Sequence, residues 1–149
     1  MNANMKYTES VSVLATIDPV SQGAGTVTTG WVPVANFHRI CAEIQTGIMG
    51  AAATLDAKVQ QAQDGSGTGA KDVPNKAITQ IVKASGDNKQ AYIELVADND
   101  LDGTNGFGYV RLSMTVGTAA SLIAGKVIGV APRFLPASSF NQAGVVQTV

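Results

Sequence analysis

The sequence is poor in the residues from which enzymes build active sites. Its 149 residues include one histidine, one cysteine and one tryptophan, which are His38, Cys41 and Trp31. Acyl transfer, metal-assisted hydrolysis and general acid–base catalysis usually draw on convergent histidine, cysteine or carboxylate side chains. The sequence therefore predicts a binding protein or a structural protein, and we do not expect an enzyme.

Aromatic and charged residues are also scarce. Aromatic residues make up 5% of the chain and charged residues 14%, against about 25% charged residues in an average soluble domain. Ten basic and eleven acidic residues leave a net charge of −1, which does little to keep molecules apart. This balance indicates a surface that is partly covered in the working state. A monomer whose surface is made polar by Ser, Thr, Asn and Gln fits the same numbers.

Several partners and compartments are not expected. The basic residues are scattered singly, so nucleic acid is not an expected partner. A single cysteine cannot form an internal disulfide, and the first 20 residues contain Lys6, Glu9 and Asp18 rather than a continuous apolar stretch. We therefore expect that the protein has no secretory signal. We also expect that it is synthesised in the cytoplasm. The uncharged segment 112–125 is too short for a membrane span, so we expect no membrane partner.

Apolar and polar residues alternate with a period of two along much of the chain, which is typical of half-buried strands. The pattern is clearest over residues 109–116, where Val110, Leu112, Met114 and Val116 share one face. Further predicted strands cover residues 11–16, 26–34, 39–45, 54–60, 91–95 and 126–131. Turn-forming clusters separate these strands, and 149 residues suit one domain. The predicted fold is all-β: a single antiparallel β-sandwich, or a jelly-roll-like variant, over residues 1–149.

Residues 74–85 are ambiguous. Ala77, Ile78, Ile81 and Val82 have the spacing of a helical face, whereas the β-branched residues of the segment favour a strand. The sequence leaves open a strand or one short helix here.

Two loops partly match ligand-binding motifs. Asp98, Asp100 and Asp102 precede a glycine as in the first half of a calcium loop, but Tyr109 stands where a bidentate carboxylate is required. The three aspartates are the candidate for a metal site, although aspartate and glycine also gather in turns. The glycine-rich segment 64–71 lacks the glycine-lysine-hydroxyl order of a phosphate loop, so we expect no cofactor.

Large aromatic residues and arginine mark candidate interface positions. Pro132, Arg133 and Phe134 follow the last predicted strand, and such residues are the usual anchors of protein interfaces. Trp31 precedes Val-Pro-Val and fits either an interface or the core. His38, beside a phenylalanine, is expected to pack against neighbouring side chains.

The order of these features resembles that of head decoration, or cement, proteins of tailed bacteriophages. The resemblance rests on Trp31-Val-Pro-Val, the Phe37-His-Arg39 start of a strand, Gly106-Phe-Gly-Tyr-Val-Arg111 and Pro132-Arg-Phe134. It implies a β-sandwich or jelly-roll, assembly as a homotrimer or similar ring, binding to the major capsid protein on the virion surface, and no catalysis. It carries over no binding residue.

Two kinds of alternative stay open. The first is another phage structural protein, such as a tail-tube, head–tail joining or capsid protein, and the second is a carbohydrate-binding β-sandwich. Under the decoration hypothesis, residues 1–10 and 137–149 are expected to reach neighbouring subunits. Phe140 is the candidate anchor in the second of these segments.

Overall fold

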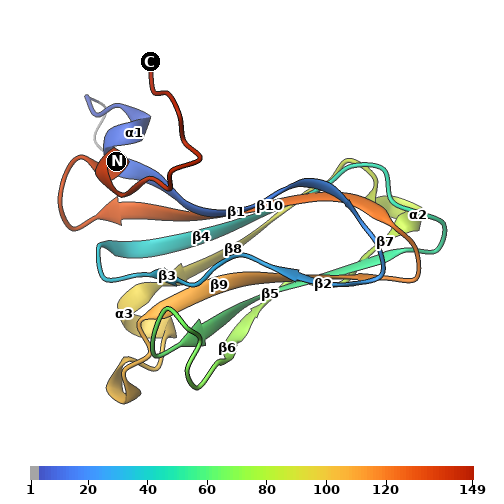
Figure 1. Ribbon diagram of the computed structural model, residues 1–149, viewed down its shortest axis with the longest axis horizontal. Helices are drawn as coiled ribbons and strands as arrows, with labels where there is room; N and C mark the ends of the chain where they lie inside the picture. The colour runs from blue at the N-terminus through green and yellow to red at the C-terminus, as the bar shows by residue number, and fades with distance from the viewer. Residues whose placement is uncertain (1–3) are drawn as a thin grey trace.

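The computed structural model describes residues 4–149 and confirms the predicted all-β sandwich (Figure 1). One sheet, here called sheet A, has four antiparallel strands in the order β1 (Val11–Gln22), β10 (Ser121–Pro132), β4 (Phe37–Thr46) and β8 (Gln90–Val96). Its register is set by pairs such as Gly129 with Ile40 and Ala42 with Ile93. Residues 4–10 and the C-terminal residues lie at the same end of the sandwich.

The second sheet, sheet B, packs against the first. Its order is β2, β9, β5, β6, with β3 also on β9 and β7 also on β5. The bounds of these strands are Gly25–Thr28 (β2), Val32–Pro33 (β3), Thr54–Ala62 (β5), Lys71–Ala77 (β6), Ile81–Val82 (β7) and Tyr109–Gly117 (β9). β2 and β3 pair with the same side of β9, and β6 and β7 pair with the same side of β5, so sheet B has four strand positions, as sheet A has. The order of the strands in the two sheets is that of a jelly roll.

The core lies between the sheets and is filled mainly by branched aliphatic residues. Ile40, Leu55, Leu112 and Val127 are at most 1% exposed and represent the four strands at the centre of the sandwich. Phe37 is the one aromatic residue in the described part of the main core cluster. Because aromatic residues are scarce, many small apolar contacts replace a few large ones.

The strand predictions hold with two differences. Residues 26–34 form two strands, because Leu112 donates its N–H to the Thr29 hydroxyl at 3.0 Å instead of to a backbone carbonyl. The ladder of backbone hydrogen bonds between this segment and β9 is interrupted there. The three residues 29–31 lie opposite only two residues of β9, 111 and 112. Residues 74–85 contain both alternatives, since β6 and β7 are followed by the helical turn α2 (Lys83–Gly86).

Short helical turns close the ends of the sandwich. They are α1 (Tyr7–Ser10), α3 (Ala97–Asp100), η1 (Gly103–Asn105) and η2 (Ala137–Phe140). After η2 the chain runs beside β1, where Gln142 donates its N–H to the Val13 carbonyl at 2.8 Å. Within residues 4–149 no helix has the length and hydrophobicity needed to cross a membrane.

Candidate interface site

The loop after β10 carries the predicted residues Pro132, Arg133 and Phe134. Pro132 is the last residue of β10 and pairs with Phe37 of β4. The Arg133 N–H donates to the Asn36 carbonyl at 2.8 Å, so the loop is tied to the segment before β4. The base of the loop is therefore held by the backbone of its own chain.

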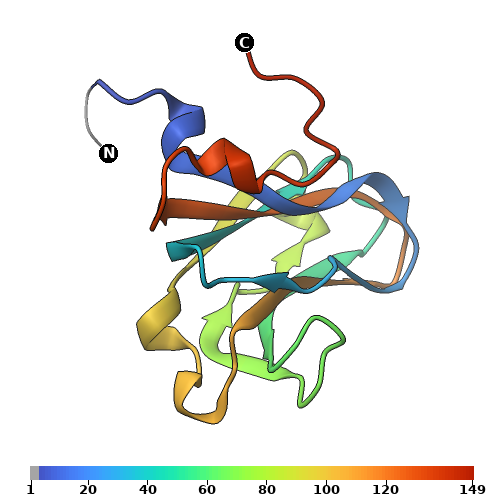
Figure 2. The ribbon, with the colours of Figure 1, turned by 60° about the vertical axis from the view of Figure 1, so that its left-hand side comes forward.

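The tip of this loop is apolar and exposed. Phe134 is 69% exposed and Leu135 is 63% exposed. Leu135 also lines a hollow of about 410 Å³ together with Met5, Val130 and Pro132. Figure 2 shows α1 and η2 close to the end of β10, where this hollow lies. We call Met5, Phe134 and Leu135 the terminal apolar patch.

An ion pair orients the same loop. The Nη2 atom of Arg133 donates to both carboxylate oxygens of Asp98, at 2.7 and 2.8 Å. This interaction holds the pKa of Asp98 below its usual value. His38 lies at the edge of the pair, with Nδ1 3.9 Å from Asp98 Oδ2, and its side chain is exposed. His38 was expected to pack against neighbouring side chains, but about half of its side chain is exposed, because the chain turns Phe37 rather than His38 inward at the start of β4.

The three aspartates of the candidate metal site point to different partners. Asp98 binds Arg133, Asp100 lies 3.1 Å from Lys76, and Asp102 binds Lys71. In residues 4–149 no three His, Cys, Asp or Glu side chains are grouped as metal ligands would be. Each carboxylate is neutralised by its own cation, so the structure does not bring the predicted ligand set together.

Trp31 is half-buried on the outer face of sheet B. The Arg111 guanidinium stacks over its ring, with Cζ 4.4 Å from the centroid, and Arg111 Nε donates to Gln60. The glycine-rich loop passes close by, because a Cβ atom on Gly67 would lie 2.6 Å from the Trp31 Nε1 atom. The sequence did not show that this loop and this ring meet.

Phe140 packs inside its own chain. Its ring lies 5.6 Å from that of Phe37 with an interplanar angle of 76°, an edge-to-face contact. Asn141 accepts hydrogen bonds from the Ser12 hydroxyl at 3.0 Å and the Val13 N–H at 2.9 Å. Residues 137–142 thus dock on β1, while Val146 and Val149 beyond them are exposed. Of the predicted N-terminal segment 1–10, residues 1–3 lie outside the described residues.

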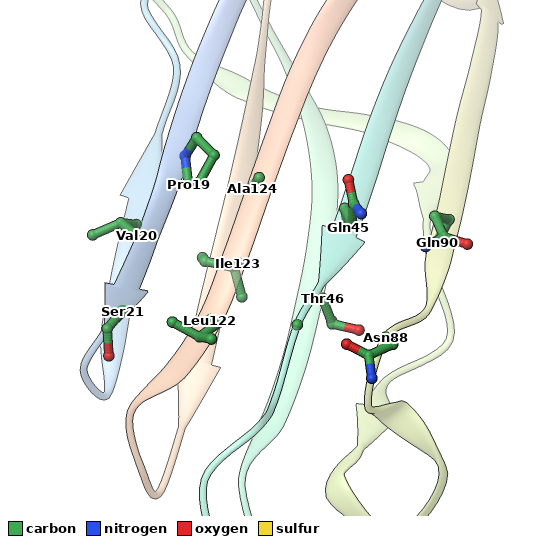
Figure 3. A pocket seen from close by; sticks show the side chains of 11 residues that line it. Pro19, Val20, Ser21, Gln45, Thr46, Asn88, Gln90, Leu122, Ile123 and Ala124 are labelled. Atoms are coloured by element: carbon green, nitrogen blue, oxygen red, sulfur yellow. The ribbon is translucent and has the colours of Figure 1, made fainter.

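A second surface was missed by the sequence reasoning. The outer face of sheet A carries a hollow of about 360 Å³. Figure 3 shows Val20 and Leu122 on its β1–β10 side and Gln45, Asn88 and Gln90 on its β4–β8 side. The only sequence signal is that Leu122 and Gln45 fall at the outward positions of alternating strands. That signal cannot show that the two strands are neighbours.

The comparisons with known proteins concern the fold alone. No protein-family model and no curated protein match the sequence. Among solved structures, the chain is similar to the SPBc2 prophage-derived protein YomS, with TM-score 0.43, 9% identity, and 80% of this chain and 93% of that chain covered. It is also similar to a chain of Triatoma virus, with TM-score 0.46, 9% identity and coverage of 95% and 74%. A further similar chain holds the N-terminal modules of endo-1,4-beta-D-xylanase 10B of Clostridium thermocellum, with TM-score 0.46, 9% identity and coverage of 85% and 29%. Function has to be argued from the chain's own residues.

Proposed function

We propose that this chain is a structural virion protein that binds and stabilises a phage capsid shell as a homo-oligomer, without catalysis. The observation that carries the proposal is the exposure of Phe134 and Leu135 on a loop whose base is fixed. Large apolar side chains on a loop whose base is fixed bury much apolar area when a partner covers them, while little backbone has to be ordered. Such side chains are typical anchors of an interface.

The remaining surface supports this proposal. Six Lys or Arg side chains each form an ion pair with a different carboxylate among the described residues, so more than half of the charged side chains are locally neutralised and repel a second subunit less. The resemblance to head decoration proteins supplies the partner, which is the major capsid protein, and the location on the capsid surface after synthesis in the host cytoplasm. A trimer or similar ring would suit a shell, because linked subunits convert later contacts into intramolecular ones.

The chain ends belong to the same proposal. Residues 143–149 contain Val145, Val146 and Val149, and the last two are almost fully exposed. These β-branched residues favour extended backbone and could add to a sheet edge of a neighbouring subunit. We propose that the tail beyond Gln142, together with residues near α1, reaches a neighbouring subunit.

The test is a double substitution in the terminal apolar patch, Phe134→Asp with Leu135→Asp. Native mass spectrometry of the purified protein is expected to show an oligomer for the parent chain and monomers for the variant. Co-sedimentation with shells assembled from the major capsid protein of the same genome is expected to fall at least tenfold. Val82→Asp, at an exposed apolar position at the other end of the sandwich, is the matched control.

Each outcome decides between the functions. An unchanged oligomer and unchanged shell binding in the double variant would refute the role of the patch. A monomeric parent chain that ignores shells would refute the decoration function itself. Sixfold rings that stack into tubes would support the tail-tube alternative instead.

A further inference from the structure

The outer face of sheet A carries a row of hollows along β4 and β8. Two hollows of about 360 and 130 Å³ lie next to each other, and a third of about 260 Å³ lies beyond them, where Lys76 of β6 and Asp100 of α3 also line it. The first two hollows share the lining residues Gln45, Gln90 and Ala124. The third hollow is lined by Cys41 of β4 and Glu94 of β8, which are the next outward-facing residues along these strands. From residue 39 to residue 45 the strand rises about 20 Å, so the row is long enough for an extended chain. We call this surface the sheet A furrow.

The charges in the furrow cancel locally. Lys126 Nζ lies 2.9 Å from Glu43 Oε2, and Lys76 Nζ lies 3.1 Å from Asp100 Oδ2. The remaining two charged residues, Arg39 and Glu94, have opposite signs and line the same hollow. A furrow without net charge offers no attraction to a polyanion or polycation. It favours a neutral ligand that forms hydrogen bonds.

An exposed tyrosine lines the middle of the furrow. Tyr92 is paired with Glu43 across β8 and β4, is 63% exposed and lines the same hollow as Lys126. Tyrosine offers a flat face for apolar C–H groups and a hydroxyl for polar ones. Gln45, Asn88 and Gln90 add amide donors and acceptors at one end.

The floor of the furrow argues against an extended peptide. β10 and β4 are each paired on both sides, and β8 is paired with β4, so the backbone groups within the face are used in the sheet. The other edge of β8 lies at the border of the sheet and not on its face. A peptide that adds to a sheet needs a free strand edge for its main-chain hydrogen bonds. Recognition in this furrow must therefore come from side chains.

We propose that the sheet A furrow binds a neutral oligosaccharide chain, with Tyr92 as a stacking platform and Gln45 and Gln90 as hydrogen-bonding residues. A neutral sugar chain is elongated, presents hydroxyl groups to amides and presents apolar ring faces to tyrosine. This binding activity is independent of the terminal apolar patch, and it would let a virion surface protein hold a polysaccharide.

The test is native affinity electrophoresis of the full chain in gels that contain soluble neutral polysaccharides: xylan, glucomannan, laminarin and mannan. At least one polymer is expected to retard the protein, and a hexasaccharide of that polymer is then titrated by heteronuclear NMR. Tyr92→Ala and the double variant Gln45→Ala with Gln90→Ala are each expected to weaken binding at least tenfold. Shifted amide signals are expected on β4 and β8. Phe134→Ala, which removes an equally exposed aromatic ring outside the furrow, is expected to bind normally.

Three results would overturn the inference. They are no retardation by any neutral polymer, retardation by anionic polymers alone, and unchanged binding in both furrow variants. Urea unfolding of Tyr92→Ala confirms that a loss of binding does not come from a loss of fold. The Phe134→Asp with Leu135→Asp variant separates the two proposals, because it is expected to lose shell binding and to keep sugar binding.

Discussion

The ring of Phe37 occupies the space that a side chain at position 129 would need. A Cβ atom on Gly129 would lie 2.6 Å from two ring carbons of Phe37, and Phe37 is buried in the core. The ring has no free volume into which it could turn, because protein interiors are close-packed. The glycine in β10 and the phenylalanine in β4 therefore depend on each other.

We expect Gly129→Ala to lower the free energy of unfolding by about 1–3 kcal/mol, because the added methyl group overpacks this site. The measurement is urea unfolding followed by far-UV circular dichroism. Gly30→Ala is the matched control, since no atom lies within 4 Å of a Cβ atom there. Equal unfolding midpoints for the two variants would show that the Phe37 ring is not fixed as described.

A second prediction concerns the contact between the glycine-rich loop and Trp31. Gly67 has a φ of +86°, and its Cβ atom would lie 2.6 Å from Trp31 Nε1. Gly67→Ala adds a clash and a backbone strain of about 1–2 kcal/mol, so we expect the loop to move away from the ring. Because Trp31 is the only tryptophan, its fluorescence maximum is expected to shift to longer wavelength.

The control for this loop is Gly65→Ala. A Cβ atom there would make an ordinary contact, 3.6 Å from Tyr109 Cε1. Its emission spectrum is expected to match that of the parent protein. A Gly67→Ala spectrum identical to both would mean that the loop does not cover the indole ring.

The strands were predictable from the sequence because burial of one sheet face imposes an alternating pattern on each strand. Residues 109–116 show this, and β9 covers them. The pairing of strands was not predictable, since alternation says nothing about neighbours. β1 and β10 are separated by about 100 residues of chain, yet they pair in sheet A.

The candidate site was only partly predictable for the same reason. Phe134 could be expected on the surface because it follows a strand between prolines, and the structure places it there. Phe140, among polar residues, was also expected at an interface, but it packs on Phe37, which is far away in the chain. The hollow beside Leu122 and Gln45 depends on strand order, which a single sequence does not encode locally.

A third prediction concerns the stability of the protein in acid. Burial acts to raise the pKa of Asp100, but hydrogen bonds from the Val96 N–H at 2.6 Å and from Lys76 outweigh it, so the pKa lies below its usual value. A carboxyl group with a lowered pKa stabilises the folded state above its unfolded pKa. This contribution is lost as the pH falls through the folded pKa.

We expect Asp100→Asn to cost about 1 kcal/mol at pH 7, because the side chain is partly screened by water, and to cost less near pH 2. Urea unfolding at the two pH values measures the difference. Asp18→Asn, at an exposed position of β1, is the control. A cost that is the same at both pH values would mean that the ionised carboxylate does not stabilise this turn.

The last prediction concerns Cys41, which lies in the sheet A furrow. Burial, followed by the negative charges of Glu43 and Glu94, raises the pKa of its thiol to about 11. The thiolate is the nucleophile, so at pH 8 we expect iodoacetamide to alkylate Cys41 roughly 100-fold more slowly in the folded protein than in urea. The rate should rise about tenfold for each pH unit up to pH 10, since each unit raises the thiolate fraction tenfold.

Glu94→Gln removes one negative charge near Cys41 and should speed alkylation at pH 8. Glu9→Gln, a charge removal on α1, is the control and should leave the rate unchanged. A rate that levels off below pH 9 would show that burial and the neighbouring carboxylates do not hold the thiol in its neutral form.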